Sequence, residues 1–191
     1  MALPSRIEGY AIVSADGMLA DATGVMPDEL KFDADQRFFA DKLERVDAVA
    51  NGRHSNEQQR NSATRKRLTL TRQILALAPD PDNPKGFLWN PAGASLAEAW
   101  AALGLDRGIL GVVGGTFVFD LFLDSYTDFF LSRAPGIALP GGRPVFTEVP
   151  RLTPEQVLTR HGLVAGKRIT LDVENDVTVT HWHRRGSVTA A

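Results

Sequence analysis

Residues 109–119 have the sequence ILGVVGGTFVF. The β-forming run 109–113 predicts a buried strand, and the apolar run 116–123 predicts a helix whose phenylalanines and leucines lie in the core. Gly114 and Gly115 separate the two elements. Two glycines at such a turn let the backbone approach a ligand, and the helix amides favour an anion. The pair also fits an ordinary tight turn, so alone it indicates only a strand–helix unit.

The rest of the chain repeats this alternation of strands and helices. Ser95, with Glu98 three residues later, has the pattern of a capping box that opens a helix. We expect a mostly parallel central sheet with flanking helices in three layers and an antiparallel C-terminal edge, in one α/β domain over residues 1–191. The expected strands are 7–13, 46–50, 68–71, 87–89, 109–113, 127–131, 168–173 and 177–182, and the expected helices are 32–43, 96–103 and 116–123.

Composition excludes several classes of function. The 191 residues include 21 Lys and Arg against 23 Asp and Glu, and a net charge of −2 argues against a nucleic-acid partner. The absence of cysteine excludes disulfides, a thiol nucleophile and cysteine-ligated metals. We see no targeting or membrane-spanning segment and expect a cytoplasmic protein. His181 and His183 share a strand face without an evident third ligand, so we expect an exposed strand end and no metal.

Three predicted strand ends carry groups suited to phosphate. Gly52-Arg53 follows one strand, Thr71-Arg72 ends the next, and the double glycine follows the strand 109–113. Arginine can bind a phosphate in a bidentate manner, and ligands of open α/β sheets collect at the carboxyl ends of the strands. Three such ends in one sheet favour a dinucleotide with an extra phosphate, which means NADP rather than NAD.

Two carboxylates begin the first predicted helix. Asp33 and Asp35 lie where an acid often serves only as a cap or as a partner of the helix dipole, and we expect that role for at least one of them. Asp35 and Phe39 are four residues apart and share a helix face. An acid and an aromatic wall would therefore face the same ligand ring.

These features together resemble the dihydrofolate reductase superfamily, which also includes the reductase domain of bacterial riboflavin biosynthesis. The resemblance implies a dihydrofolate reductase-like fold and NADPH as the hydride donor. Order and spacing hold from residue 7 to about residue 132. The matching segments are VSADGMLA at 13–20, MP at 26–27, the helix with Asp35 and Phe39, GRHSNE at 52–57, RKRLTLT at 65–71, VGGTFVF at 113–119 and FFLS at 129–132.

The resemblance also implies roles for individual residues. Asp35 matches the acid that binds the substrate ring and supports its protonation, although counting forward from Met26-Pro27 favours Asp33, and Ser132 matches the hydroxyl that hydrogen-bonds the acid. Substrate contacts are implied for Met26, Phe39 and Arg65, the last to a glutamate-tail carboxylate. Cofactor contacts are implied for Ala11, Leu19 and Ala20 near the nicotinamide, for Gly52, Arg53, His54 and Ser55 at the phosphates, for Thr71 and Arg72 at the 2′-phosphate, and for Val113, Gly114, Gly115, Thr116 and Phe117 around the pyrophosphate.

The chain departs from the family at three places, one of which is a short segment between Glu57 and Arg65. Asp28 stands where dihydrofolate reductases usually carry tryptophan, and segment 134–150 is longer and richer in proline and glycine than expected. We therefore expect a divergent NADPH-dependent reductase that transfers hydride to a C=N bond of a pteridine-like heterocycle. The alternatives are a riboflavin-pathway reductase acting on a ribosylamino-pyrimidine phosphate and a non-catalytic NADP(H)-binding protein. A homodimer is compatible with the riboflavin branch.

Overall fold

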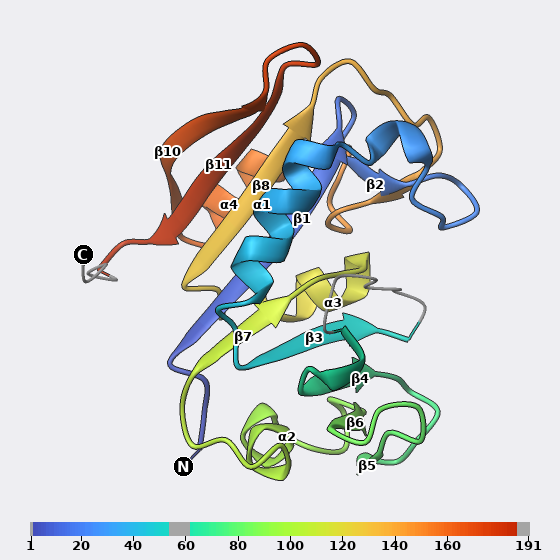
Figure 1. The fold of residues 1–191 in the computed structure, drawn as a ribbon, viewed down its shortest axis with the longest axis vertical. Helices are drawn as coiled ribbons and strands as arrows, with labels where there is room; N and C mark the ends of the chain where they lie inside the picture. Colours follow the sequence, from blue (N-terminus) through green and yellow to red (C-terminus); the bar gives the residue numbers. More distant parts are fainter. Residues whose placement is uncertain (1, 54–61, 187–191) are drawn as a thin grey trace.

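The computed structural model describes residues 2–53 and 62–186 and contains a nine-stranded sheet (Figure 1). The sheet has the order β10-β11-β8-β1-β7-β3-β4-β6-β5, and β2 and β9 form a separate pair. The strands are β1 (Arg6–Ser14), β2 (Met18–Ala20), β3 (Ala48–Gly52), β4 (Arg67–Leu70), β5 (Leu77–Pro79), β6 (Gly86–Trp89), β7 (Ile109–Val112), β8 (Asp128–Ala134), β9 (Arg143–Pro144), β10 (Leu163–Asp172) and β11 (Val177–Arg184). The helices are α1 (Asp33–Leu43), α2 (Leu96–Ala102), α3 (Thr116–Leu121) and α4 (Pro154–Arg160), with 3₁₀ turns η1 (Asp28–Leu30) and η2 (Ser62–Thr64).

The centre of the sheet is parallel. β1 pairs in parallel with both β7 and β8, and parallel pairing continues through β3, β4 and β6. β11 and β10 add antiparallel strands at one edge, as the sequence predicts. The antiparallel pairing of β5 with β6 at the other edge was not predicted.

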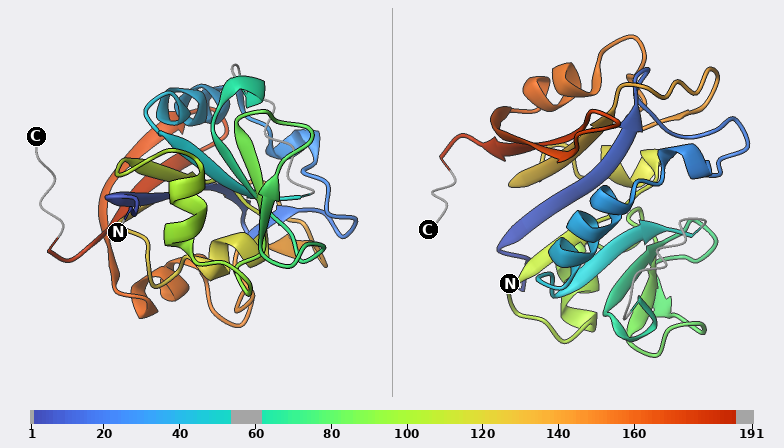
Figure 2. Two further views of the ribbon diagram at one scale, coloured as in Figure 1. Left: turned by 90° about the horizontal axis from the view of Figure 1, so that it is seen from below. Right: turned by 45° about the horizontal axis from the view of Figure 1, so that its top comes forward.

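Alternating side chains of β1 define the two faces of the sheet. Ile7 and Val13 belong to a core cluster that also holds buried side chains of α2, α3 and α4. Tyr10 packs on the opposite face with Leu43 of α1. Figure 2 shows α1 on one side of the sheet and α3 and α4 on the other, so the molecule has the predicted three layers.

Two details of the helices correct the sequence prediction. Helix α4 was not predicted, although Thr153 and Gln156 form a capping box around Pro154 at its start. Helix α3 has six residues, and it presents only one face to the sheet. Phe117 and Leu121 are therefore 55% and 38% exposed rather than in the core. Within the described residues, no helix is long and apolar enough to cross a membrane.

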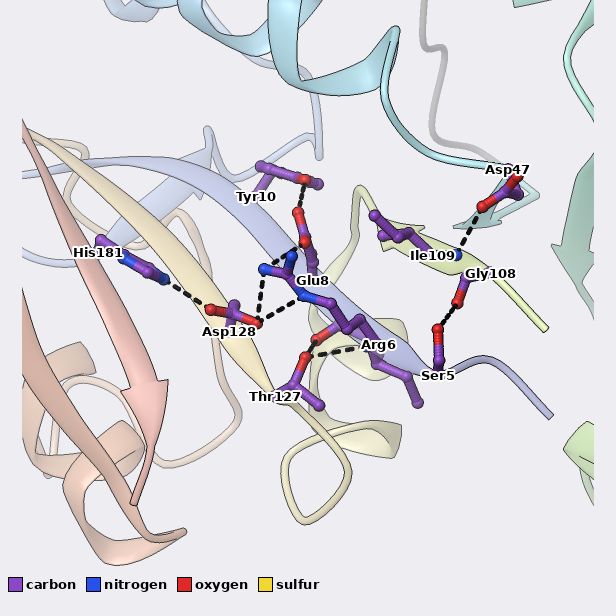
Figure 3. A network of polar contacts seen from close by, with 11 residues as sticks. Ser5, Arg6, Glu8, Tyr10, Asp47, Gly108, Ile109, Thr127, Asp128 and His181 are labelled. Atoms are coloured by element: carbon purple, nitrogen blue, oxygen red, sulfur yellow. Dashed lines mark hydrogen bonds and ion pairs between the residues drawn. The ribbon is translucent and has the colours of Figure 1, made fainter. Parts of the chain in front are cut away.

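A charged network around the buried carboxylates of Glu8 and Asp128 joins β1, β8 and β11 on the α1 face (Figure 3). The Arg6 guanidinium lies 2.8 Å from Glu8 and 3.0 Å from Asp128, and the Tyr10 hydroxyl donates to Glu8. His181 Nε2 lies 2.7 Å from Asp128, so His181 is not the exposed residue that was expected. The described ranges contain no group of three or more potential metal ligands.

Candidate functional site

The structure separates the two acids that begin α1. Asp33 is exposed, whereas Asp35 is only 6% exposed and lies beside Ser132 of β8, which is 3% exposed. Burial raises the pKa of Asp35, and a hydrogen bond from the Ser132 hydroxyl opposes that rise. Asp35 can therefore hold a proton closer to neutral pH than an exposed aspartate can.

Aromatic and aliphatic side chains pack around α1 on the same face of the sheet. The ring centroids of Phe39 and Tyr10 are 6.1 Å apart, and Tyr10 stacks on Phe130 at 5.3 Å. Met26 packs against a small buried cluster that includes Ile12. The predicted substrate contacts Met26 and Phe39 thus lie in apolar clusters on the face of the sheet that carries Asp35 and Ser132.

The carboxyl ends of β3 and β7 meet at the glycine turn. The Gly52 amide donates to the Gly114 carbonyl at 2.8 Å, and the Val113 amide bonds back to β3. Gly114 has a φ of +113°, which favours glycine, and a cis peptide joins it to Gly115. Among the described residues, no heavy atom lies within 4 Å of a Cβ placed on Gly115, so these residues leave open space beside the backbone there. The Thr116 hydroxyl is already engaged with the Pro144 carbonyl.

A polar cavity of about 480 Å³ lies at the ends of β3 and β4. Arg53 and Thr71, two of the predicted phosphate contacts, line it. Arg72 lies nearby in sequence, and its guanidinium is 5.9 Å from the exposed Phe117 ring. The cavity is separate from the acid, because neither Asp35 nor Ser132 is among its described lining residues.

Two of the predicted phosphate contacts, His54 and Ser55, lie outside the described residues. Sequence reasoning missed four buried polar residues that line the cavity, namely Asn51, Arg67, Thr69 and Asn83. Asn51 directly precedes Gly52, and Thr69 lies two residues before Thr71, on the same face of the strand. The position next to the predicted contact and the strand periodicity could therefore have pointed to Asn51 and Thr69. Arg67 holds Asn51 in place through a hydrogen bond of 2.8 Å.

The loop after β1 is tied to segment 134–150. Leu19 is half-buried and Ala20 is buried, and their strand β2 pairs with β9. The Asp16 carboxylate accepts the Leu139 amide at 3.1 Å and the Ser14 hydroxyl at 2.5 Å. Ala11, the third predicted nicotinamide contact, is half-buried on β1.

Two positions that the sequence resemblance connects with folate recognition have partners within the chain. The Arg65 side chain is 7% exposed and lies 3.3 Å from Glu44. Asp28, which stands where the sequence resemblance leads us to expect a tryptophan, is 94% exposed and pairs with Lys31 at 2.7 Å. Arg65 therefore already has a carboxylate partner. Position 28 supplies no aromatic ring near Asp35.

Solved structures share this fold at low sequence identity. A provisionally assigned riboflavin biosynthesis protein from Shewanella sp. PV-4 aligns with a TM-score of 0.62 at 21% identity, over 94% of this chain and 99% of that chain. Dihydrofolate reductase from Enterococcus faecalis, complexed with NADP(H) and RAB-propyl, aligns with a TM-score of 0.59 at 14% identity, over 97% and 99% of the two chains.

A third structure is a diaminohydroxyphosphoribosylaminopyrimidine deaminase/5-amino-6-(5-phosphoribosylamino)uracil reductase from Thermotoga maritima. It aligns with a TM-score of 0.60 at 15% identity, over 95% of this chain and 57% of that longer chain. No family model and no curated protein matches the sequence. The strand order and layers define an α/β protein with a mostly parallel sheet. The chain has the dihydrofolate reductase-like fold.

Proposed function

We propose that the chain is an NADPH-dependent reductase that reduces a C=N bond in a small heterocyclic substrate. The observation that carries the proposal is the buried Asp35 carboxyl, whose pKa is raised by burial and which bonds to Ser132. A carboxyl with a raised pKa keeps its proton to higher pH than an exposed aspartate does, so it can donate a hydrogen bond to a ring nitrogen and support its protonation. The fold supports this assignment, because the neighbouring structures include named reductases.

Each residue of the candidate site has its own role in the proposed reaction. Asp35 holds the proton at the substrate nitrogen, and Ser132 orients the carboxyl. Phe39 and Met26 provide an apolar wall that excludes water from the ring. NADPH supplies the hydride when it is bound, while the protein fixes the distance and angle between the two rings.

The residues at the strand ends fit such a cofactor. Arg53 beside the polar cavity and Arg72 beside Phe117 present two cations to phosphate groups. The open space at Gly115 admits close approach of a pyrophosphate to the backbone. Cationic groups at two neighbouring strand ends favour the cofactor with the extra 2′-phosphate.

Titration of NADPH and NADH into the protein, followed by nicotinamide fluorescence, tests the cofactor assignment. We expect Arg53→Ala to weaken NADPH binding by about 1–3 kcal/mol, the loss of a charged hydrogen bond. Arg107→Ala, at an exposed position remote from the cavity, is the matched control. Equal NADPH affinity in the Arg53 variant and the wild type would contradict the cofactor assignment.

A second candidate substrate is a ribosylamino-pyrimidine phosphate of the riboflavin pathway. The Arg65–Glu44 ion pair favours it, because a folate glutamate tail would have to displace Glu44 from a buried arginine. NADPH oxidation with dihydrofolate in one arm and the pyrimidine in the other separates the two substrates. NADPH binding without oxidation across both classes would instead identify a non-catalytic binding protein.

A further inference from the structure

Helix α1 carries the candidate acid but buries little of its own surface. Of its eleven residues, only Asp35 and Leu43 are buried. In the described structure no side-chain hydrogen bond caps its first turn, where Phe32 is the N-cap residue. Helices in proteins owe most of their stability to the packing of one face rather than to intrinsic propensity. The few contacts between α1 and the sheet therefore decide where Asp35 lies.

Lys42 makes one of these contacts at the carboxyl end of α1. Its ammonium nitrogen lies 3.9 Å from the centroid of the Phe130 ring on β8 and 5.4 Å from that of Phe38. Both distances fall within the range of a cation–π attraction, which is stronger for a cation that is partly removed from water. Lys42 is half-buried, so its ammonium can bind the helix to the Phe130 ring.

The Phe130 ring is itself held in a row of three parallel rings. Tyr10, Phe130 and His181 are direct neighbours on the adjacent strands β1, β8 and β11. The Phe130 ring lies 5.3 Å from Tyr10 and 4.6 Å from His181, with interplanar angles of 6° and 8°. Polar contacts with Glu8 and Asp128 hold the two outer rings (Figure 3). The ring that receives the ammonium is therefore a fixed point on the sheet.

The acid lies on the same face of α1 as this contact. Asp35, Phe39 and Lys42 are spaced by four and three residues, which places them on one side of a helix. Ser132 and Phe130 are two residues apart on β8 and point to the same face of the sheet. Asp35 bonds to Ser132 and Lys42 contacts Phe130, so α1 meets β8 near both of its ends. A helix fixed at both ends cannot tilt and carry the acid away from the serine.

We propose that Lys42 is a positioning residue, which through its contact with the Phe130 ring holds the carboxyl end of α1 on the sheet and so keeps Asp35 beside Ser132. The inference rests on the role proposed for Asp35, but the contact itself belongs to the protein without substrate or cofactor. Loss of the contact would let α1 tilt and let water reach the acid. Because burial is the main cause of the raised Asp35 pKa, that pKa would then fall towards the ordinary value.

The charge of Lys42 has a direct effect of the opposite sign. A cation stabilises nearby carboxylates, so its removal without any movement of α1 could only raise their pKa values. The charged groups near Lys42 are Glu8, Asp128, Arg6 and Arg45. If Lys42 served only to balance the charge of this network, its loss would not lower the Asp35 pKa. A fall in that pKa therefore distinguishes positioning from charge balance.

Carbon-13 NMR titration of the side-chain carboxyl groups measures the Asp35 pKa in the free protein, with the signal assigned by its loss in Asp35→Asn. Lys42→Gln removes the charge and should lower the Asp35 pKa. Lys42→Arg keeps a cation that can lie over the ring and should keep the wild-type value. Arg45→Gln removes a charge from an exposed position three residues further along the chain. It is the matched control and should not lower the Asp35 pKa.

An NADPH oxidation assay provides a second readout. Lys42→Gln should reduce kcat about tenfold, because a small displacement of the acid is costly, and should leave the Kd of NADPH unchanged. Lys42→Arg should restore kcat. A wild type without turnover would contradict the proposed function, but the NMR titration would still decide the role of Lys42.

The positioning role is overturned by an Asp35 pKa that stays constant or rises in Lys42→Gln, or by a fall that Lys42→Arg does not restore. An equal fall in Arg45→Gln overturns it as well, because the effect would then follow the charge rather than the ring contact. Circular dichroism checks that each variant is folded, and Lys42→Ala replaces Lys42→Gln if the latter unfolds.

Discussion

Asp35 and Asp33 are two residues apart on α1, yet the fold gives them different environments. Asp33 is exposed and Asp35 is buried beside Ser132. The sequence narrowed the candidate acid to these two positions; the spacing to Phe39 favoured Asp35, whereas counting from Met26-Pro27 favoured Asp33. The choice depends on the rotation of α1 against β8, which no local pattern encodes.

Asp35→Asn should abolish turnover and leave NADPH binding intact, because the amide keeps the shape and loses the titrating proton. The measurement is steady-state NADPH oxidation beside a cofactor titration. Asp33→Asn is the matched control and should retain activity. Loss of turnover in the Asp33 variant alone would transfer the role of the acid to Asp33.

Ser132→Ala should move the alkaline limb of the rate–pH profile to higher pH. The Ser132 hydrogen bond stabilises the Asp35 carboxylate, so its removal raises a pKa that burial has already raised. The protonated acid then persists to higher pH. Ser125→Ala, at an exposed position, should leave the profile in place. A profile that stays put or moves to lower pH in the Ser132 variant would contradict the assigned hydrogen bond.

At the scale of elements, sequence periodicity predicted most strands and the helices α1, α2 and α3. It missed α4, although Thr153 and Gln156 have capping-box spacing, because the proline- and glycine-rich segment before them suggested continuing loop. It also placed Phe117 and Leu121 in the core, since an apolar run does not reveal how short α3 is. The candidate site was predicted at the strand ends, but its partition into a polar cavity and a separate buried acid required the fold.

The cap of α4 can be tested by itself. Thr153→Ala should lower the free energy of unfolding by about 1 kcal/mol, because the backbone amide of Gln156 loses the Thr153 hydroxyl that accepts its hydrogen bond. Urea denaturation measures the change. Thr159→Ala, within the same helix, should change the stability by less than about 0.5 kcal/mol, since alanine is the better helix former. Equal effects of the two changes would show that the capping bond contributes little.

At the scale of the whole molecule, the network around Asp128 links the first strand to the last. Burial alone would raise the pKa of Asp128, but hydrogen bonds from His181 and Thr127 and the charge of Arg6 lower it to about 2. The ordinary value is 3.8. The ionised Asp128 carboxylate therefore stabilises the folded state fully above pH about 4, and this stabilisation is lost as the pH falls towards 2.

This shift predicts a loss of about 2 kcal/mol in the free energy of unfolding between pH about 5 and pH about 2, as part of the total acid destabilisation. Urea titrations at a series of pH values measure it. Asp128→Asn should flatten this part of the curve, while Asp124→Asn, whose side chain is 88% exposed, should not. Superimposable curves for the wild type and the Asp128 variant would contradict the assignment.

The position of β1 has a consequence for how the chain folds during synthesis. β1 is made first, yet its partners in the sheet are β7 and β8, and Arg6 is 122 residues from Asp128. The first strand must therefore leave the ribosome and wait, with Glu8 and its apolar neighbours still exposed, until more than half of the chain has followed. Contacts so distant in sequence make folding slow, and an unpaired apolar strand is prone to aggregate.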